Sequence, residues 1–451
     1  MLPFSPWLLP LLLLGSVAPG VVLTAQLKVR PGDRLTVATA VSIFSTFCGW
    51  WCLWIAGVPA AWCSLIVLAG CCLLAVSGWR DLRAVFTMPL VRWQAAAWLA
   101  VAGHALLLHA AVFSYSGGLW GGDWCGHLTQ AGFFLADGDP RPNRFPGGDA
   151  ITGRPPLENI VAAHFWRLGR GHYADYQVVM TWLNSLACLP VLMLVSRLTP
   201  RQQNNQQQAV LLTAVAVMVL PAFAQNAVYP WTKLLAAFFV VPGLVFWADG
   251  AGRGRRPHRE LAAGLLAAGL LVHYSAAVYV VAVVGFELVL TASQVIRRDW
   301  PRLARSFMTN LRAAAVAVAV VAPWLGWALW MYGPRGTFAT NTAVVDARVY
   351  SLAENLLKML LNIRDTLLPS FLRGPTDLTR LFQEQASLLG WIRDSCFLPY
   401  QVNFPAALGV VGWAAVLPAA GVIRRALPRS PGLFWSSVAA VSLLLGVAAH
   451  G

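Results

Sequence analysis

The chain has 451 residues, of which 58% are hydrophobic and only 11% are charged. A soluble domain has no use for so much apolar surface, and several apolar runs exceed the roughly 18–20 residues that cross a bilayer. The formal net charge of +15 fits nucleic-acid binding, but in a membrane protein such an excess more commonly marks cytoplasmic loops. The composition therefore excludes a soluble globular protein, and we expect a membrane protein that binds no nucleic acid.

Twelve apolar runs follow one another along the chain. Backbone groups inside lipid must find hydrogen-bond partners within the protein, so each span should be a helix rather than a strand. We therefore predict an all-α polytopic membrane protein with about twelve transmembrane helices. The runs cover residues 5–25, 37–56, 59–78, 93–114, 176–196, 209–227, 230–248, 261–275, 276–295, 313–332, 403–422 and 432–450.

The two ends of the chain leave alternatives open. Leucine-rich sequence before small residues makes 5–25 resemble a signal peptide, but basic residues follow this run instead of preceding it. We expect a retained helix whose N-terminus lies outside. The chain ends at Gly451 directly after an apolar run, so a truncated C-terminus is one interpretation of the tail.

Charge is distributed unevenly between short and long loops. Six short loops hold 20 of the 33 Lys and Arg residues and only five acids, whereas the long loops 115–175 and 333–402 hold 12 basic and 12 acidic residues. Because Lys and Arg concentrate in cytoplasmic loops, we place the short loops in the cytoplasm and both long loops outside. The six short loops are 26–36, 79–92, 197–208, 249–260, 297–312 and 423–430.

These features divide the chain into four parts. Residues 1–92 hold three leading helices, and 93–332 form a transmembrane core that includes the first outer loop. Residues 333–402 form the second outer loop, in which 353–368 (AENLLKMLLNIRDTLL) predicts an amphipathic helix near the membrane surface. Residues 403–451 hold the C-terminal helices.

The segment 117–127 (GGLWGGDWCGH) directly follows an apolar run. Asp123 at the mouth of a helix bundle is suited to act as a general base toward an acceptor hydroxyl, or it is an ordinary loop residue. Trp120 and Trp124 suit stacking on a sugar ring, and equally suit the membrane interface. His127 is a further candidate for the acceptor or sugar site. If a helix begins at Asp123, His127 shares a face with it, where it would orient that carboxylate, join a metal site or be solvated.

Four further places at outer ends of spans carry candidate phosphate-binding groups. Arg154 offers a rigid donor fork before two Pro, although a rigid surface turn is the alternative. Lys233 begins the seventh run, where it would grip a phosphate or reach lipid headgroups. His273 and Tyr274 lie between two short runs, and Arg335 opens the second long loop.

Other features do not predict chemistry. The chain has no Walker loop, no GxSxG elbow and no dinucleotide fingerprint. Glu287 lies within an apolar run toward its cytoplasmic half, which favours a structural hydrogen bond over catalysis. The eight Cys lack zinc-ligand spacing, and only Cys125 and Cys396 fall in outer loops, where they either pair or stay free.

The order of several motifs resembles bacterial members of the GT-C superfamily of membrane glycosyltransferases, of the family 39 or dolichyl-phosphate-mannose-protein mannosyltransferase-like kind. The resemblance covers about 93–332. It rests on GGDWCGHLTQAGFFL (121–135), TGRPPLEN (152–159), DYQVVMTWLNSLACLPVLML (175–194), VYPWTKLLAAFFV (228–240) and GLLVHYSA (269–276).

The resemblance implies an inverting transfer from a polyprenyl-phosphate-sugar to an acceptor lipid, glycan or protein, outside a bacterial cytoplasmic membrane. Asp123 would take the family's acidic position, and basic groups would stabilise the departing phosphate. Many relatives have an Asp-Glu pair, whereas residue 124 is Trp here. A lipid-phosphate leaving group needs no metal, so we predict no metal and no cofactor. The phosphate candidates are Arg154, Lys233, His273, Tyr274 and Arg335.

Two alternatives belong to other classes. A transporter or lipid flippase commonly has repeats and broken helices with polar groups at mid-membrane. We find no repeat, and the candidate polar residues gather at the outer ends of the runs. A non-catalytic relative of the same superfamily is the second alternative.

Overall fold

The computed structural model describes residues 4–111, 123–146, 148–200, 202–253, 256–340, 351–368, 408–409, 414 and 429–442. Within these residues all regular structure is helical, which confirms the expected all-α fold. Most of the apolar run 403–422 lies outside the described residues, as do Trp120 and Cys396.

Six helical segments of the described chain are long and apolar enough to cross a membrane, or eight if two bent helix pairs each count as one span. The bent pairs are α4 (Trp79–Thr87) with α5 (Pro89–Ala111), at 91°, and α10 (Gln203–Val219) with α11 (Pro221–Val228), at 69°. This supports a polytopic membrane protein, whereas twelve spans stay a prediction. The six are α2 (Pro31–Ile55), α3 (Ala60–Ser77), α8 (Tyr173–Ser185) continued by α9 (Cys188–Leu198), α12 (Lys233–Arg253), α14 (Ala277–Ile296) and α15 (Trp300–Phe338).

The predicted spans at 5–25 and 261–275 form short helices. The helix α1 (Leu8–Leu23) has 16 residues, and α13 (Arg256–Val272) has 17. The helix α13 ends because His273 takes an extended backbone with φ −153°. Both helices still belong to the hydrophobic core, in which Leu8 and Val272 are fully buried.

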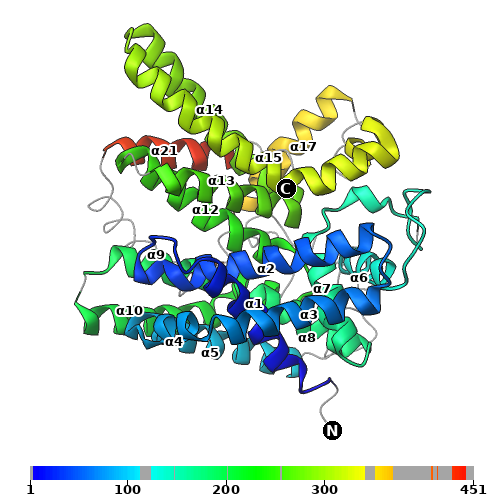
Figure 1. The fold of residues 1–451 in the computed structure, drawn as a ribbon. Helices are drawn as coiled ribbons and strands as arrows, with labels where there is room; N and C mark the ends of the chain where they lie inside the picture. The colour runs from blue at the N-terminus through cyan, green and yellow to red at the C-terminus, as the bar shows by residue number, and fades with distance from the viewer. Residues whose placement is uncertain are drawn as a thin grey trace.

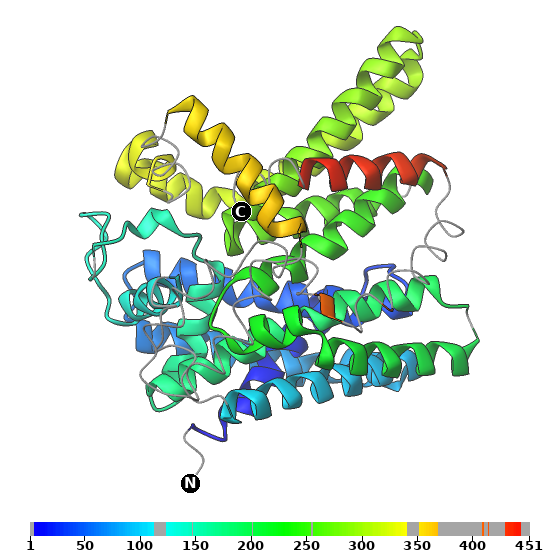
Figure 2. The ribbon, with the colours of Figure 1, turned by 180° about the vertical axis from the view of Figure 1, so that it is seen from behind.

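The helices lie in layers that run across the molecule. Figure 1 shows α2, α3, α5 and α10 side by side, with α12 and α13 packed on each other beside them. Figure 2 shows the α14–α15 pair projecting furthest from these layers. Only 28% of the α14 apolar window and 11% of the α15 window are buried, so most of their apolar surface is left for lipid. The short C-terminal helix α21 (Arg429–Val441) packs on α14.

A buried polar cluster joins four helices, and we call it the Glu287 junction. Glu287 of α14 accepts hydrogen bonds from Trp247 Nε1 of α12 (3.0 Å) and Asn310 Nδ2 of α15 (3.0 Å). Its carboxylate also pairs with Arg259 of α13 at 3.1 Å, and Arg259 donates to Asn310 Oδ1. Each hydrogen-bond donor in the cluster faces an acceptor, and the arginine faces the carboxylate. Glu287 therefore has the structural role that its place in the run predicts.

A second ion-pair network joins the ends of helices that carry the basic short loops. Arg197 at the end of α9 donates two hydrogen bonds of 2.8 Å to Asp33 of α2 and one of 2.7 Å to Asp249 of α12. Gln94 of α5 donates to the Gly32 carbonyl at 2.9 Å in the same region. This end of the bundle lies opposite the end that holds α6 (Asp123–Leu135) and α7 (Leu157–Leu168) (Figure 1).

The two long loops meet at the α6–α7 end. The Thr152 hydroxyl donates to the Gly336 carbonyl at 2.5 Å and lies 2.9 Å from the Thr340 hydroxyl. Asn143 also donates to the Gly336 carbonyl, at 3.0 Å. The chain does not leave the helix at residue 333 as expected, because α15 bends at Gly333 (φ 66°) and continues to Phe338. The root of the second loop therefore rests on the first.

The predicted helix within the second loop is α17 (Leu352–Leu367). It begins with a capping box, in which Ser351 N donates to Glu354 Oε2 and Glu354 N donates to Ser351 Oγ. Leu352 and Leu360 are 78% and 66% exposed. The helix is confirmed, and its contact with a membrane surface stays a prediction.

Candidate functional site

The helix α6 begins at Asp123, so the expected helix at this point is confirmed. A carboxylate in the first turn is favourable because the first backbone N–H groups of a helix carry a partial positive charge. The side chain of Asp123 lies outside the described residues, and so does Trp120. The site is therefore built from the residues that follow Asp123 and from the loops that pack on them.

Four side chains below the first turn of α6 form a closed set of hydrogen bonds, which we call the His127 circuit. His127 Nδ1 lies 3.2 Å from Asn159 Oδ1, and Asn159 Nδ2 donates to Gln130 Oε1. Gln130 Nε2 donates to the carbonyls of Ile151 (3.0 Å) and Arg154 (3.2 Å). Arg154 Nη1 closes the set at 3.1 Å from His127 Nε2.

The circuit fixes the protonation of His127. Arginine can only donate, so Nε2 must accept and the proton must sit on Nδ1, where it is donated to Asn159. Burial lowers the pKa of His127 well below 6.5, and the charges of Arg154, His273 and Lys233 lower it further, against the Asn159 hydrogen bond. The ring is 1% exposed. His127 is thus a neutral support beneath Arg154, not the solvated, sugar-facing or metal-binding group that the sequence suggested.

Gly126 has no side chain, which lets the Arg154 guanidinium pack directly against α6. A Cβ at position 126 would lie 2.8 Å from Arg154 Nε and 3.0 Å from Cζ, closer than side chains pack. Arg154 itself precedes Pro155 and Pro156, and Pro156 caps α7. Because proline presets the backbone at a helix start, the Arg154 carbonyl and side chain leave the chain in a fixed direction.

Two other predicted cations lie near this guanidinium. The charges of His273 and Lys233 both act on the His127 ring, together with that of Arg154. Lys233 is exposed at the start of α12, with Nζ 3.6 Å from the centre of the Trp231 ring. His273 Nδ1 accepts from the backbone N–H of Ser275 at 3.1 Å, which orients the ring. Arg154 and Lys233 are thus two cations that, together with His273, influence the His127 ring.

The remaining predicted residues have different surroundings. The Tyr274 hydroxyl donates to the Thr152 carbonyl at 3.0 Å, so it holds the loop that carries Arg154. Arg335 is exposed in the last helical turn of α15, and none of its described contacts reaches the His127 circuit. Trp124 is half-buried against Tyr229 and Trp231, with its ring 5.9 Å from that of Tyr173.

Sequence reasoning missed Glu158. It follows the Arg-Pro-Pro motif in the first turn of α7, is 0% exposed, and neither carboxylate oxygen has a hydrogen-bond partner among the described residues. Burial raises the pKa of Glu158 well above 4.5, so the group is a neutral acid. A signal was present, because Glu-Asn is a polar pair in the otherwise apolar start of α7. Its neighbour Asn159 belongs to the His127 circuit.

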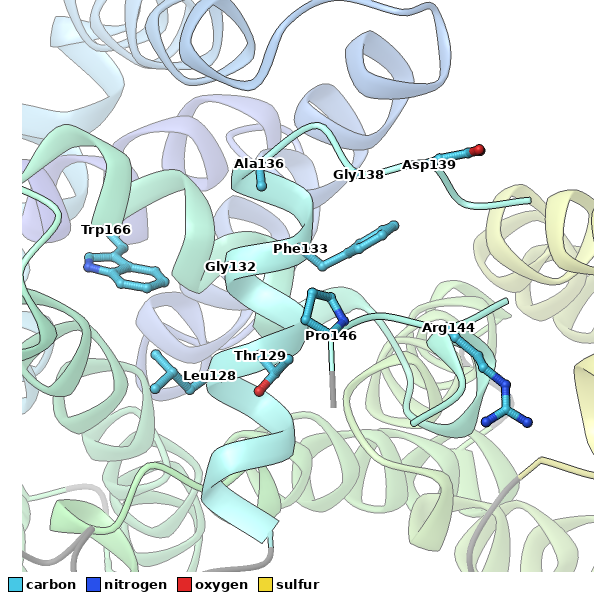
Figure 3. A pocket seen from close by; sticks show the side chains of 10 residues that line it. All are labelled: Leu128, Thr129, Gly132, Phe133, Ala136, Gly138, Asp139, Arg144, Pro146 and Trp166. Carbon is cyan, nitrogen blue, oxygen red and sulfur yellow. The ribbon is translucent and has the colours of Figure 1, made fainter. Parts of the chain in front are cut away.

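A cavity of about 530 Å³ lies on the other face of α6. Figure 3 shows Thr129, Gly132 and Phe133 along one side, Trp166 of α7 opposite, and the Asp139 and Arg144 side chains pointing away at the rim. Its lining is mostly apolar, and Arg144 Nη1 is occupied by the Gly148 carbonyl at 3.0 Å. The buried face of α6 thus carries the His127 circuit, and its outer face borders an apolar cavity.

Within the described ranges, no group of three or more His, Cys, Asp or Glu side chains is arranged to hold a metal ion. No protein-family model, no curated protein and no solved structure matches this chain.

Proposed function

We propose that this chain is an integral-membrane glycosyltransferase that uses a polyprenyl-phosphate-sugar donor. The observation that carries the proposal is the Arg154 guanidinium, which lies beside Gly126 at the N-terminal end of α6 with its Nη1 3.1 Å from His127 Nε2. Cationic donors at a helix N-terminus bind phosphate well. The exposed apolar surfaces of α14 and α15 provide the lipid contact that a polyprenyl chain requires.

The same groups explain how the transfer is accelerated. The acceptor oxygen attacks the anomeric carbon, the bond from that carbon to the phosphate oxygen breaks, and its electron pair goes to the phosphate. Arg154, Lys233 and His273 stabilise the charge that gathers on the leaving phosphate. The position of Arg154 is set in advance by Gly126, the His127 circuit and Pro156, so this group needs little reorganisation during the reaction.

Asp123 is the proposed base. It begins α6, one helical turn before His127, and it accepts the proton of the acceptor hydroxyl as the new bond forms. The polyprenyl phosphate leaves without a metal ion, because three cations already face the developing charge. We place this end of the bundle outside a bacterial cytoplasmic membrane, since the basic short loops lie at the opposite end.

The direct test is transfer of radiolabelled sugar from a polyprenyl-phosphate donor by the purified chain in lipid nanodiscs. We expect Arg154→Gln to lower kcat/KM about 100-fold, the loss typical for one anion-stabilising donor. Asp123→Asn should abolish transfer while donor binding persists. The matched control is Arg141→Gln, in the same loop, because Arg141 is 81% exposed and pairs with Asp139. Equal loss in Arg141→Gln, or full activity in Arg154→Gln, would refute the proposal.

The bent pair α10–α11 supports a second candidate, a lipid transporter, because interrupted helices are typical of such proteins. The bend at Pro221 comes 12 residues before Lys233 in the sequence, so it is close along the chain to a residue of the proposed phosphate site. Movement of a fluorescent polyprenyl phosphate across a vesicle bilayer, without sugar transfer, would favour this candidate. Sugar transfer without such movement would exclude it.

A further inference from the structure

Buried polar atoms without partners gather behind the first turn of α6. Trp124 Nε1, both Glu158 carboxyl oxygens and the Tyr176 hydroxyl have no hydrogen-bond partner among the described residues. Glu158 and Tyr176 are each 0% exposed. Native proteins satisfy nearly all buried polar groups, because an unsatisfied one costs about 1–3 kcal/mol. Several of them in one region therefore require an explanation.

These groups belong to one cluster, which we call the acid–aromatic cluster: Trp124, Glu158, Tyr173 and Tyr176. Ring centroids lie 5.9 Å apart for Trp124 and Tyr173 and 6.1 Å apart for Tyr173 and Tyr176. Glu158 lies in the first turn of α7, and α7 packs on both α6 and α8. The cluster is thus contributed by α6, α7 and α8, and its Glu158 follows Arg154 by four residues.

The chemistry of the cluster fits a neutral polyhydroxyl ligand. Aromatic side chains present faces for the C–H groups of a sugar ring, and their N–H and O–H groups serve its hydroxyls. A neutral carboxylic acid both donates and accepts, so it can serve one hydroxyl without a compensating charge. A site built to hydrogen-bond a hydroxyl also discriminates strongly against ligands that lack it.

We propose that Glu158, Tyr176 and Trp124 form the subsite that recognises the sugar of the donor. This inference rests on the proposed function and names the part of the donor that this cluster binds. A sugar is joined to its phosphate through one oxygen, so a phosphate at Arg154 keeps its sugar close to Arg154, and Glu158 lies four residues further on in the first turn of α7. Trp124, half-buried at the first turn of α6, borders the accessible surface and must move for the sugar to enter.

The test compares binding of two ligands by the full chain in nanodiscs: farnesyl phosphate alone, and farnesyl phosphate that carries mannose, glucose, galactose or arabinose. We expect wild type to bind one of the sugar-bearing forms at least tenfold more tightly than farnesyl phosphate alone. Glu158→Leu should remove that preference and leave the affinity for farnesyl phosphate unchanged. Glu158→Gln should retain it within about threefold, since an amide also donates and accepts.

A control and a stability measurement separate recognition from a structural role. His164→Leu also removes a buried polar side chain of α7 whose Nδ1 is unpartnered among the described residues, and it should keep the sugar preference. The Tm of Glu158→Leu should equal or exceed that of wild type, because a carboxyl without partners destabilises the fold. A lower Tm with an unchanged sugar preference would overturn the proposal. So would the absence of any sugar preference in wild type.

The outcome also separates this inference from the proposed function. A sugar preference that Glu158→Leu removes, in a protein that transfers no sugar, would establish the subsite and refute the glycosyltransferase. Sugar transfer with a donor preference that is identical in wild type and Glu158→Leu would support the enzyme and refute the subsite.

Discussion

Two glutamates are buried among the residues that the structure describes, and their surroundings are opposite. Glu287 joins four helices, and its carboxylate meets an arginine, an indole N–H and an amide. Glu158 is buried at least as deeply, at 0% exposure against 8%, yet both of its oxygens are without partners in the described chain. The first is a structural junction in which the carboxylate is fully hydrogen-bonded. The second is a carboxyl whose desolvation is not offset by any hydrogen bond among the described residues.

Two arginines, Arg259 beside Glu287 and Arg154 four residues before Glu158, also differ in the groups that hold them. Arg259 is held by the carboxylate of Glu287, whereas Arg154 is held against Gly126 by the neutral ring of His127. The charge of Arg259 is balanced by a carboxylate within the protein. The contact of Arg154 in the His127 circuit is with a neutral ring, as suits a cation that binds an anion.

The largest expected effect comes from breaking the Glu287 junction. Glu287→Leu leaves Arg259 buried without its carboxylate, so the free energy of unfolding should fall by about 3–5 kcal/mol. Thermal denaturation in detergent, followed by tryptophan fluorescence, measures the change. The double variant Glu287→Leu with Arg259→Leu should recover most of the loss, because no charge is then left uncompensated. If the double variant is as unstable as the single one, the cluster is held by packing instead of charge.

The next effect is a pH dependence of stability that Glu158 should contribute. The folded state raises the pKa of Glu158 well above the unfolded value of 4.5, so the folded state holds a proton that the unfolded state releases. Stability from this group is complete below pH 4.5 and falls by about 1.4 kcal/mol per pH unit as the pH rises toward the folded pKa. Comparing Tm of wild type and Glu158→Gln from pH 5 to 8 isolates the contribution. Parallel curves would show that the carboxyl is not neutral when folded.

A smaller effect should follow from a methyl group beside Arg154. Gly126→Ala places a Cβ 2.8 Å from Arg154 Nε, closer than such atoms pack, so the guanidinium must shift. We expect donor affinity to fall about tenfold, equivalent to about 1.4 kcal/mol, with little change in Tm. Gly132→Ala on the same helix is the control, because a Cβ there meets nothing within 4 Å. Equal affinity in both variants would show that the seating of Arg154 does not matter for binding.

The smallest effect is expected for a conservative change in the His127 circuit. His127→Gln supplies one acceptor and one donor, so donor affinity should stay within about threefold of wild type, whereas His127→Leu should behave like Arg154→Gln. The folded state lowers the pKa of His127, so wild-type stability should fall as the pH drops below 6.5. His127→Gln should lose that dependence in thermal scans. A steeper fall in His127→Gln would contradict the neutral ring.

Much of the fold could be predicted from the sequence, because membrane helices are long apolar runs. The runs at 37–56, 59–78 and 313–332 match α2, α3 and part of α15. Hydropathy does not reveal where such a run bends, so the 69° break before Pro221 was not expected. The helical turn after Gly333 was also missed, since Gly-Pro ordinarily ends a helix.

The candidate site was predicted in part. Arg154, Lys233 and His273 were chosen individually as cations at outer ends, and the structure brings their fields together. The partners that orient them were not predictable, because Asn159 and Gln130 lie 29 residues apart and ordinary amides carry no sequence signal. Glu158 was passed over because its burial, unlike its identity, depends on how α7 packs on α8.

The contacts of Thr152 tie the two long loops together at the α6–α7 end of the molecule. Its hydroxyl ties the first long loop to the root of the second, and its carbonyl accepts from Tyr274 two residues before Arg154. Two loops fastened at one point do not part independently. Under the proposed function, donor entry and product release should therefore depend on the same contact, so a mutation that removes the Thr152 hydroxyl should change the rates of both.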